Sequence, residues 1–233
     1  MNGKFYGVSV GPGDPELITI KAINIIKKCD IIIVPQTKNE NMLALSIAQK
    51  SVDMSDKLIV PIKFLMSHNI EKTQKNHEKS CEIIMEYLRQ GHDTVMLNIG
   101  DISIYSTYSY IAEIIEKNGF ETEMCAGVPS FCAAAARLKK PLVCRREVLI
   151  VAPGYSDELE ELITVSGTKV IMKSGKHMER VKNLAEKYGM SDNVVIVESC
   201  GLENEKIHYG IDDTENGYFS LMIIKNPKEN ENA

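Results

Sequence analysis

A strand, a glycine-rich turn and a helix follow one another directly near the start of the chain. The apolar residues between Phe5 and Val10 indicate a strand, which ends at Gly11-Pro12-Gly13. Asp14 is expected to be the N-cap of the following helix, with Pro15 as its first residue. Open α/β sheets often bind ligands where such a loop feeds a helix N-terminus. The stretch is a candidate ligand site, although a well-capped surface turn would explain the same residues.

This loop is unsuited to a phosphate group. Pro12 has no backbone N–H to donate, and Glu16 stands where the dinucleotide-binding fingerprint needs its third glycine. The carboxylates of Asp14 and Glu16 fall in the first helical turn, where they complement the helix dipole and would repel an anion. We therefore expect a neutral or cationic ligand, and the same residues disfavour an NAD-dependent oxidoreductase.

The length and charge of the chain limit the classes of protein it can belong to. With 233 residues it is long enough for one large α/β domain or two small ones. Its net charge of −5 argues against nucleic-acid binding through a broad basic surface. No apolar run approaches the roughly 20 residues of a membrane span, and the N-terminus leads straight into a strand rather than a secretory signal. We expect a cytoplasmic protein that binds neither nucleic acid nor membrane.

The cysteines and histidines indicate no metal site. The six cysteines form no C-x-x-C pair and are expected to be buried free thiols, and the five histidines show no ligand spacing. The sequence also lacks a G-x-S-x-G elbow, a Walker P-loop and an H-E-x-x-H motif. The chain is therefore expected either to bind a ligand without reacting or to position an already activated cofactor.

Strand and helix patterns alternate in the first part of the chain. The continuous apolar run from Asp30 to Pro35 is typical of a strand buried on both faces, as in a parallel sheet. The alternation predicts a parallel or mixed sheet with helices on its faces. The other expected strands are 57–61, 94–99 and 121–125, and the expected helices are 41–52, 68–89, 103–117 and 130–136.

A basic segment from Arg137 to Arg146, without any acidic residue, indicates a linker to a second domain. The predicted domains are therefore 1–138 and 139–233, both of α/β type. In the second, the expected strands are 148–152, 168–172 and 193–199, the expected helices are 156–164 and 176–188, and segments 206–209 and 217–225 are expected to form an antiparallel hairpin.

A second candidate site follows the buried strand 94–99, where the sequence continues with Gly100-Asp101. A carboxylate at such a strand end could accept from a hydroxyl or amine, or neutralise a cation. Capping the following helix is a compatible role for Asp101. Residues 103–110 then carry more hydroxyl groups than core packing alone would favour.

Three motifs, taken together, resemble a known family. They are residues 11–19 with Lys21-Ala22, then Gly100-Asp101 with Tyr105, then Gly127-Val128-Pro129-Ser130. In order and separation they are similar to the tetrapyrrole methylases, although Ile102 stands where many relatives have proline. The resemblance implies an S-adenosylmethionine-dependent methyltransferase with two α/β domains, mostly parallel or mixed sheets flanked by helices, and the cofactor in a cleft between the domains. It also implies a homodimer.

Within this family, residues 100–110 and 218–221 resemble the branch that methylates C-20 of precorrin-2, or of its cobalt form, in cobalamin synthesis. One alternative is another methyltransferase of the same fold, acting on uroporphyrinogen, a ribosomal RNA ribose or a modified histidine of the diphthamide pathway. The other is a non-catalytic ligand-binding protein on this scaffold.

The resemblance also implies roles for individual residues. The implied cofactor contacts are Pro12, Gly100, Asp101, Ile104, Ser130, Phe131 and Met172. The implied substrate contacts are Asp101, Lys173 and Tyr218, and Asp101 is the leading candidate for a general base. In the implied reaction a ring carbon attacks the methyl group in line, S-adenosylhomocysteine leaves, and the carbon then loses a proton.

The implied ligands agree with the residues. A sulfonium cofactor carries no phosphate, and its polarised methyl group can be held by C–H···O contacts to backbone carbonyls. The substrate is a ring with many carboxylates, which the basic segment together with Lys173 and Lys176 could meet by charge-assisted hydrogen bonds. A solvated linker is the alternative interpretation of that segment.

Overall fold

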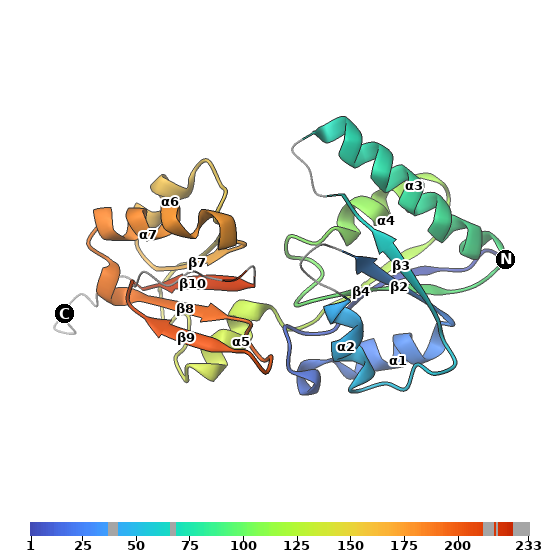
Figure 1. The fold of residues 1–233 in the computed structure, drawn as a ribbon, viewed down its shortest axis with the longest axis horizontal. Helices are drawn as coiled ribbons and strands as arrows, with labels where there is room; N and C mark the ends of the chain where they lie inside the picture. The colour runs from blue at the N-terminus through green and yellow to red at the C-terminus, as the bar shows by residue number, and fades with distance from the viewer. Residues whose placement is uncertain (37–41, 66–68, 212–216, 218, 226–233) are drawn as a thin grey trace. The chain divides into compact units, whose positions relative to one another are not determined.

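In a computed structural model the chain divides into two compact units, Met1–Ser130 and Phe131–Ala233 (Figure 1). The structure describes residues 1–36, 42–65, 69–211, 217 and 219–225. The division falls at the start of helix α5 (Ser130–Arg137), whereas the domain boundary predicted from the sequence falls just after its end. The sequence-based boundary after residue 138 stays a prediction.

The first unit is built on a five-stranded sheet in which every neighbouring pair is parallel. The strand order is β3-β2-β4-β1-β5. This confirms the parallel arrangement that the continuous apolar runs predict, since strands covered on both faces need apolar residues throughout. The strands are β1 (Phe5–Ser9), β2 (Ile31–Gln36), β3 (Leu58–Lys63), β4 (Thr94–Asn98) and β5 (Thr122–Cys125).

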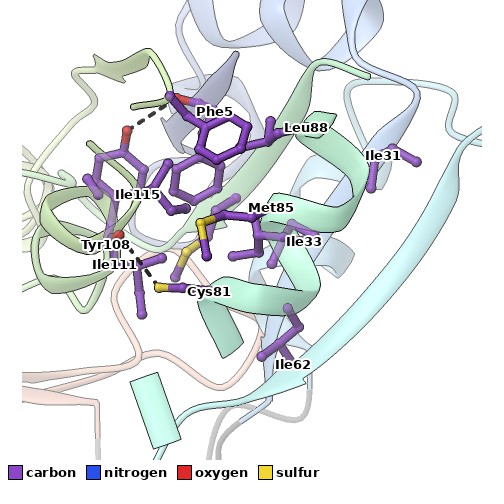
Figure 2. Close-up of a cluster of buried hydrophobic side chains, with 14 of the residues drawn as sticks. Phe5, Ile31, Ile33, Ile62, Cys81, Met85, Leu88, Tyr108, Ile111 and Ile115 are labelled. Carbon is purple, nitrogen blue, oxygen red and sulfur yellow. Dashed lines mark hydrogen bonds between the residues drawn. The ribbon is translucent and has the colours of Figure 1, made fainter. Parts of the chain in front are cut away.

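Helices cover both faces of this sheet. Figure 1 shows α1 (Ile20–Lys28) and α2 (Leu43–Gln49) on one face, and α3 (Ile70–Arg89) and α4 (Tyr108–Lys117) on the other. The core beneath α3 and α4 includes the rings of Phe5 and Tyr108, whose centroids are 5.2 Å apart (Figure 2). Burial raises the pKa of Tyr108 to about 12, and its hydroxyl donates to the Glu123 carbonyl.

Two helices begin five residues later than the sequence predicts, the largest such differences among the described helices. Asp14 caps only a single 3-10 turn (η1, Pro15–Leu17), and α1 has its own N-cap at Thr19, whose hydroxyl accepts from Ala22 N. The prediction that a helix begins near residue 103 is wrong, because α4 begins at Tyr108. Tyr105 has a φ of 50°, which is outside the helical region and interrupts any earlier start.

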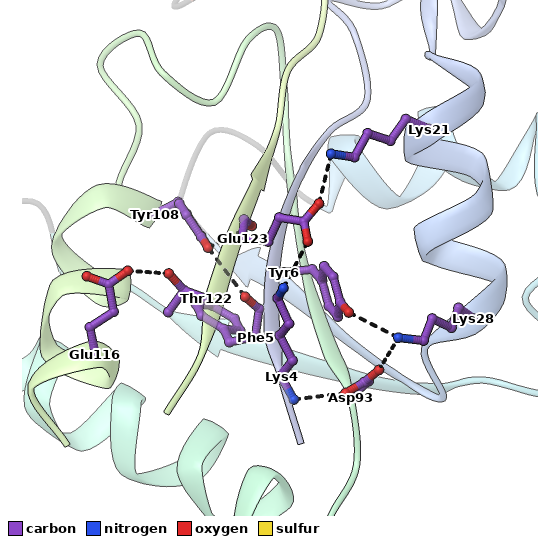
Figure 3. A network of polar contacts seen from close by, with 10 residues as sticks. All are labelled: Lys4, Phe5, Tyr6, Lys21, Lys28, Asp93, Tyr108, Glu116, Thr122 and Glu123. Atoms are coloured by element: carbon purple, nitrogen blue, oxygen red, sulfur yellow. Dashed lines mark hydrogen bonds and ion pairs between the residues drawn. The ribbon is translucent and has the colours of Figure 1, made fainter. Parts of the chain in front are cut away.

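Figure 3 shows a polar network that joins α1 to strands β1 and β5. Glu123 accepts from Lys4 and Lys21 at 3.0 and 2.8 Å, and Asp93 pairs with Lys28 at 2.7 Å. The hydrogen bonds that the Lys28 ammonium donates to Asp93 and Tyr6 raise its pKa. Because these charges are at least partly exposed, each pair contributes little on its own and is screened by salt.

The second unit has a mixed sheet in the order β6-β7-β10-β8-β9. Only β6 and β7 are parallel, and the predicted hairpin of the last two strands is wrong, because β8 lies between β9 and β10 and pairs with each. The sequence Ser-Leu-Met-Ile-Ile of β10 is fully buried and takes a central position, while the more polar β9 is an edge strand. The strands are β6 (Leu149–Pro153), β7 (Thr168–Met172), β8 (Val194–Glu198), β9 (Lys206–Tyr209) and β10 (Ser220–Ile224).

Two helices, α6 (Leu159–Thr164) and α7 (Met178–Lys187), lie on one face of this second sheet (Figure 1). Their apolar residues pack with those of the strands into a separate core. The prediction of buried thiols is confirmed at four cysteines and wrong at Cys132 and Cys144, which are exposed. In the part of the chain that the structure describes, no helix is both long and apolar enough to cross a membrane.

Candidate functional site

The carboxyl ends of β1 and β4 form the topological switch point of the first sheet. The two strands are neighbours, but the chain leaves β1 toward β2 and leaves β4 toward β5, in opposite directions across the sheet. Open α/β sheets bind their ligands at such points. Both candidate loops of the sequence, residues 11–14 and 100–105, begin here.

These two loops are joined through their backbones. Gly100 N donates to Gly11 O at 2.8 Å, and the two residues form an isolated antiparallel bridge. Gly100 has a φ of 74°, a conformation that a side chain would disfavour. The buried hydroxyl of Ser9 accepts from Ile102 N at 2.9 Å and so ties the second loop to β1. Nothing in the sequence alone marks Ser9, because its partner is 93 residues away.

The Asp101 carboxylate connects the loop after β4 to the loop after β5. Its Oδ1 accepts from Ser103 N at 2.9 Å and from the Ser103 hydroxyl, and its Oδ2 accepts from Gly127 N at 2.7 Å. Burial raises the pKa of this carboxyl, but the hydrogen bonds from Ser103 and Gly127 outweigh burial and hold the pKa below its usual value. Asp101 is therefore an ionised carboxylate at neutral pH.

These contacts bear on the roles predicted for Asp101. It does not cap α4, which begins seven residues later; it closes a turn with Ser103 instead. A carboxylate oxygen accepts about two hydrogen bonds, so Oδ1 is saturated and Oδ2 keeps one acceptor position beside Gly127. A carboxylate with a lowered pKa is a weak proton acceptor. The geometry favours a positioning role for Asp101, and its role as a base stays a prediction.

Gly127 allows the third loop to approach the other two. A Cβ on Gly127 would lie 2.7 Å from the Gly100 carbonyl oxygen and still closer to the Ser9 Cβ, so no larger residue fits. Ser130 comes near the same place, since a Cβ on Gly100 would lie 4.0 Å from its nitrogen. The structure thus brings Gly100, Asp101 and Ser130 together beside the loop of Pro12. Ile104 belongs to this group, because its N–H donates to Asp101 O.

The groups at this edge suit a cation better than a phosphate. Pro12 is buried and has no N–H, and the Glu16 and Leu17 N–H groups of η1 already donate to Asp14. An anion would meet the carboxylates of Asp14 and Asp101. The sulfonium cofactor that the family resemblance implies has no phosphate and carries a positive charge. The nearby carboxylates and the lack of available N–H groups in this loop suit such a ligand. Among the described residues, no group of three or more His, Cys, Asp or Glu is placed to hold a metal ion.

The remaining predicted site residues belong to the second unit. Phe131 is buried in α5, and Met172 and Lys173 lie at the carboxyl end of β7. Lys173 has a φ of 51°, which is rare for a non-glycine residue and recurs at functional sites. Tyr218 lies outside the described residues. The predicted ligand contacts of these residues stay predictions.

The basic segment lies at the amino-terminal end of strand β7, whereas Lys173 lies at its carboxyl end. Leu142 O accepts from the hydroxyl of Thr168, the first residue of β7, whereas Lys173 follows its last residue. A strand of this length separates its ends by roughly 16 Å. Arg137, at the start of the segment, pairs with Glu205. These contacts favour the solvated linker as the interpretation of the basic segment 137–146, and its substrate contacts stay a prediction.

Known proteins resemble the chain over nearly its whole length. Residues 4–210 match a family model described as tetrapyrrole (corrin/porphyrin) methylases. A protein described as a probable cobalt-precorrin-2 C(20)-methyltransferase, from Methanocaldococcus jannaschii, is 36% identical over 95% of this chain and 96% of its own length. The cobalt-precorrin-2 C(20)-methyltransferase of Salmonella typhimurium is 29% identical over 96% of this chain and 97% of its own.

Among solved structures, the uroporphyrin-III C-methyl transferase of Thermus thermophilus, complexed with S-adenosyl homocysteine, has the same fold. Its TM-score is 0.72 at 20% identity, and the match covers 96% of this chain and 97% of that one. At this identity the likeness concerns the fold alone. It confirms the predicted α/β class with parallel and mixed sheets flanked by helices.

Proposed function

Because the chain belongs to the tetrapyrrole (corrin/porphyrin) methylase family, we propose that it methylates C-20 of precorrin-2 or of its cobalt form, cobalt-factor II. The chain is an S-adenosylmethionine-dependent methyltransferase, since that is the chemistry of the family. The observation that supports the substrate is the 36% identity, over 95% of the chain, to a relative whose name specifies this position. The reaction belongs to cobalamin biosynthesis.

In this proposal the loops at the first sheet's switch point hold the cofactor. The Asp101 carboxylate fixes the loop after β5 through Gly127, and the glycine backbones allow close approach of the ligand. The cofactor supplies a methyl group on a positively charged sulfur, activated for attack by a ring carbon. The chain orients that carbon in line with the methyl group and excludes water.

Substrate contacts are proposed for Lys173, Asp101 and Tyr218. The Lys173 ammonium suits a carboxylate of the ring, because charge-assisted hydrogen bonds are the stronger kind. The acceptor position left on Asp101 Oδ2 suits a substrate N–H. The small-molecule partner is thus a polycarboxylate tetrapyrrole. The homodimer that the resemblance implies is likewise a proposal, which sedimentation velocity tests.

Methyl transfer to a defined carbon is the direct test. Purified protein is incubated with S-adenosylmethionine and with precorrin-2 or cobalt-factor II, and the product is expected to be heavier by one methyl group, about 14 Da. A ¹³C-labelled methyl group then locates the substituted carbon by NMR. No gain with either substrate, or a label at a carbon other than C-20, would reject the substrate assignment.

The same assay separates the alternatives. Uroporphyrinogen, ribosomal RNA and the diphthamide precursor are tested in parallel with the same enzyme preparation. Calorimetry that finds tight cofactor binding, without turnover of any tetrapyrrole, would favour a non-catalytic binding protein.

A further inference from the structure

Glu198 is a buried carboxylate at the end of β8 that the proposed site does not use. It is 8% exposed. Its Oε2 accepts from Gly217 N at 3.0 Å, and its Oε1 lies 3.1 Å from His208 Nε2 on the neighbouring strand β9. Burying a charge destabilises the fold unless the charge is paired and hydrogen-bonded. The Gly217 N–H supplies a hydrogen bond to this carboxylate, and this contact reaches out of the sheet.

Gly217, Phe219 and Ser220, which we call the β10 entry segment, are anchored on both sides. Within the segment, the Ser220 hydroxyl donates to Gly217 O at 2.6 Å. On one side, Ser199 N donates to Phe219 O at 2.9 Å; on the other, the Ser174 hydroxyl donates to Ser220 O at 3.4 Å. Ser199 follows β8 and Ser174 follows β7, so the two strands that flank β10 also fix its beginning.

The β10 entry segment ends near Lys173. In the antiparallel pairing of β10 with β7, the paired residues end at Met222 and Ile171, and Ser220 O accepts from Ser174, the residue after Lys173. Lys173 and Ser199 occupy equivalent positions after the flanking strands, and both have left-handed backbones, with φ of 51° and 49°. Such a conformation is unfavourable for a residue with a side chain and persists where its surroundings impose it.

We propose that Glu198 is a positioning residue for substrate binding. Through Gly217 it holds the β10 entry segment against the end of β7, and this fixes the backbone from which Lys173 reaches a carboxylate of the tetrapyrrole. The inference rests on the proposed function for its substrate. In this proposal Glu198 acts through the backbone of Lys173, so the KM for the tetrapyrrole is expected to respond more strongly than the Kd for S-adenosylmethionine.

Two substitutions distinguish the role of the Glu198 acceptor oxygen from that of the side-chain volume. Glu198→Ala removes the acceptor of the Gly217 N–H, and the KM for the tetrapyrrole is expected to rise about tenfold, the equivalent of about 1.4 kcal/mol. The Kd for S-adenosylmethionine is expected to change by less than the KM. Glu198→Gln keeps an oxygen for Gly217 and turns its amide N–H toward His208, so its KM is expected within about twofold of the wild type.

Glu205 provides a matched control at the same edge of the sheet. Its carboxylate also accepts from a backbone N–H, that of Gly201 at 2.8 Å, and from Arg137 at 2.7 Å, but these residues lie outside the β10 entry segment. Glu205→Ala is therefore expected to lower the thermal midpoint and leave the tetrapyrrole KM unchanged. An equal rise of KM in both alanine variants would overturn the proposal.

A fluorescence probe tests the positioning without any substrate. The chain contains no tryptophan, so Phe219→Trp introduces a single emitter into the β10 entry segment. Adding Glu198→Ala is expected to shift its emission to the red and lower its anisotropy, while adding Glu205→Ala changes neither. Wild-type inactivity on every tetrapyrrole would reject the proposed function, and this emission would still decide the role of Glu198. Unchanged emission in the Glu198→Ala background overturns the inference.

Discussion

The two sheets present their carboxyl edges in different ways. In the first unit all strands are parallel, and three loops meet backbone to backbone at Gly11, Gly100 and Gly127. In the second unit β10 enters in the opposite direction between β7 and β8, and side chains of Ser174 and Glu198 hold its beginning. Close backbone approach at glycines thus distinguishes the first edge, which Asp101 and Ser9 also hold by side-chain hydrogen bonds, whereas the second edge depends mainly on side-chain hydrogen bonds.

This difference determines which changes each edge tolerates. Backbone packing leaves no space for an added methyl group, so the first edge is sensitive to volume. Side-chain anchors tolerate small changes of volume but fail when an acceptor is lost, because the partner N–H then no longer ties its segment to the sheet. Added volume at the first edge should consequently weaken binding of the cofactor, whereas loss of an acceptor at the second edge should weaken binding of the tetrapyrrole.

The largest effect is expected from Gly127→Ala, which adds volume at the first edge. The new methyl group meets Gly100 O and Ser9, and overpacking of this kind typically lowers the free energy of unfolding by about 1 to 3 kcal/mol. Because the loops move apart to relieve the clash, the Kd for S-adenosylmethionine is expected to rise about 30-fold. Isothermal calorimetry measures it. Ala126→Val adds volume at the exposed neighbouring position and is expected to leave the Kd within about twofold. A normal Kd for Gly127→Ala would break the comparison.

The next effect concerns Asp101, whose carboxylate joins the loops after β4 and β5 at the first edge. Asp101→Asn keeps a single acceptor oxygen, so the cofactor Kd is expected to rise about tenfold. Because the Asp101 pKa lies below its usual value, its folded-state contribution is present above about pH 4 and is lost only as pH falls further. The pH–rate profile between pH 6 and 9 should therefore not change. A general base would instead show a lowered kcat with an unchanged Kd.

A smaller effect is expected at the second edge from Lys173→Asn. Asparagine tolerates the left-handed backbone at this position, so the free energy of unfolding should change by less than about 0.5 kcal/mol. The loss of the ammonium is expected to raise the tetrapyrrole KM about fivefold. Lys139→Asn makes the same change at another lysine with positive φ, in the basic segment, and should leave KM unaltered. Similar KM values for both variants would remove Lys173 from the site.

The smallest effect tests whether the stability of the first unit can change without a change in its cofactor affinity. His77 is buried between Phe64 and Tyr110, with ring centroids 6.2 and 6.0 Å away, and burial lowers its pKa. Its stabilising neutral form is present above the unfolded pKa of about 6.5 and is lost as pH falls below it. His77→Phe should therefore show a shallower fall of Tm between pH 7 and pH 5, with an unchanged cofactor Kd. An equally steep fall would contradict this.

The sequence predicted the first edge far better than the second. Glycines, prolines and continuous apolar runs are local signals, and they located β1, β4 and Gly100-Asp101 correctly. The late start of α4 was missed because it depends on a contact between the Ser106 hydroxyl and Asn98, which the local hydroxyl pattern does not reveal. The order of β8, β9 and β10 was missed because sequence neighbours were paired, whereas burial placed β10 at the centre.

Asp101 and Glu198 show the same limit of sequence-based prediction, which does not identify long-range hydrogen-bond partners. A carboxylate after a buried strand is visible in the sequence at Asp101, but its partner Gly127 is not. Glu198 has no local signal, since its partner lies 19 residues away on the far side of β9 in the chain. Long-range hydrogen bonds of this kind are decided by strand order, which residue patterns constrain weakly.

The strand order of the first sheet also has a consequence for the order of folding. β1 and β2 are consecutive in the chain but do not pair; β4 lies between them. A nascent chain that has emerged only as far as residue 93 lacks the strand that joins its first two, so this sheet closes late and through contacts of high sequence separation. The bridge between Gly11 and Gly100 can form only after that insertion. The edge that carries the candidate site is consequently among the last parts of its sheet to assemble during synthesis.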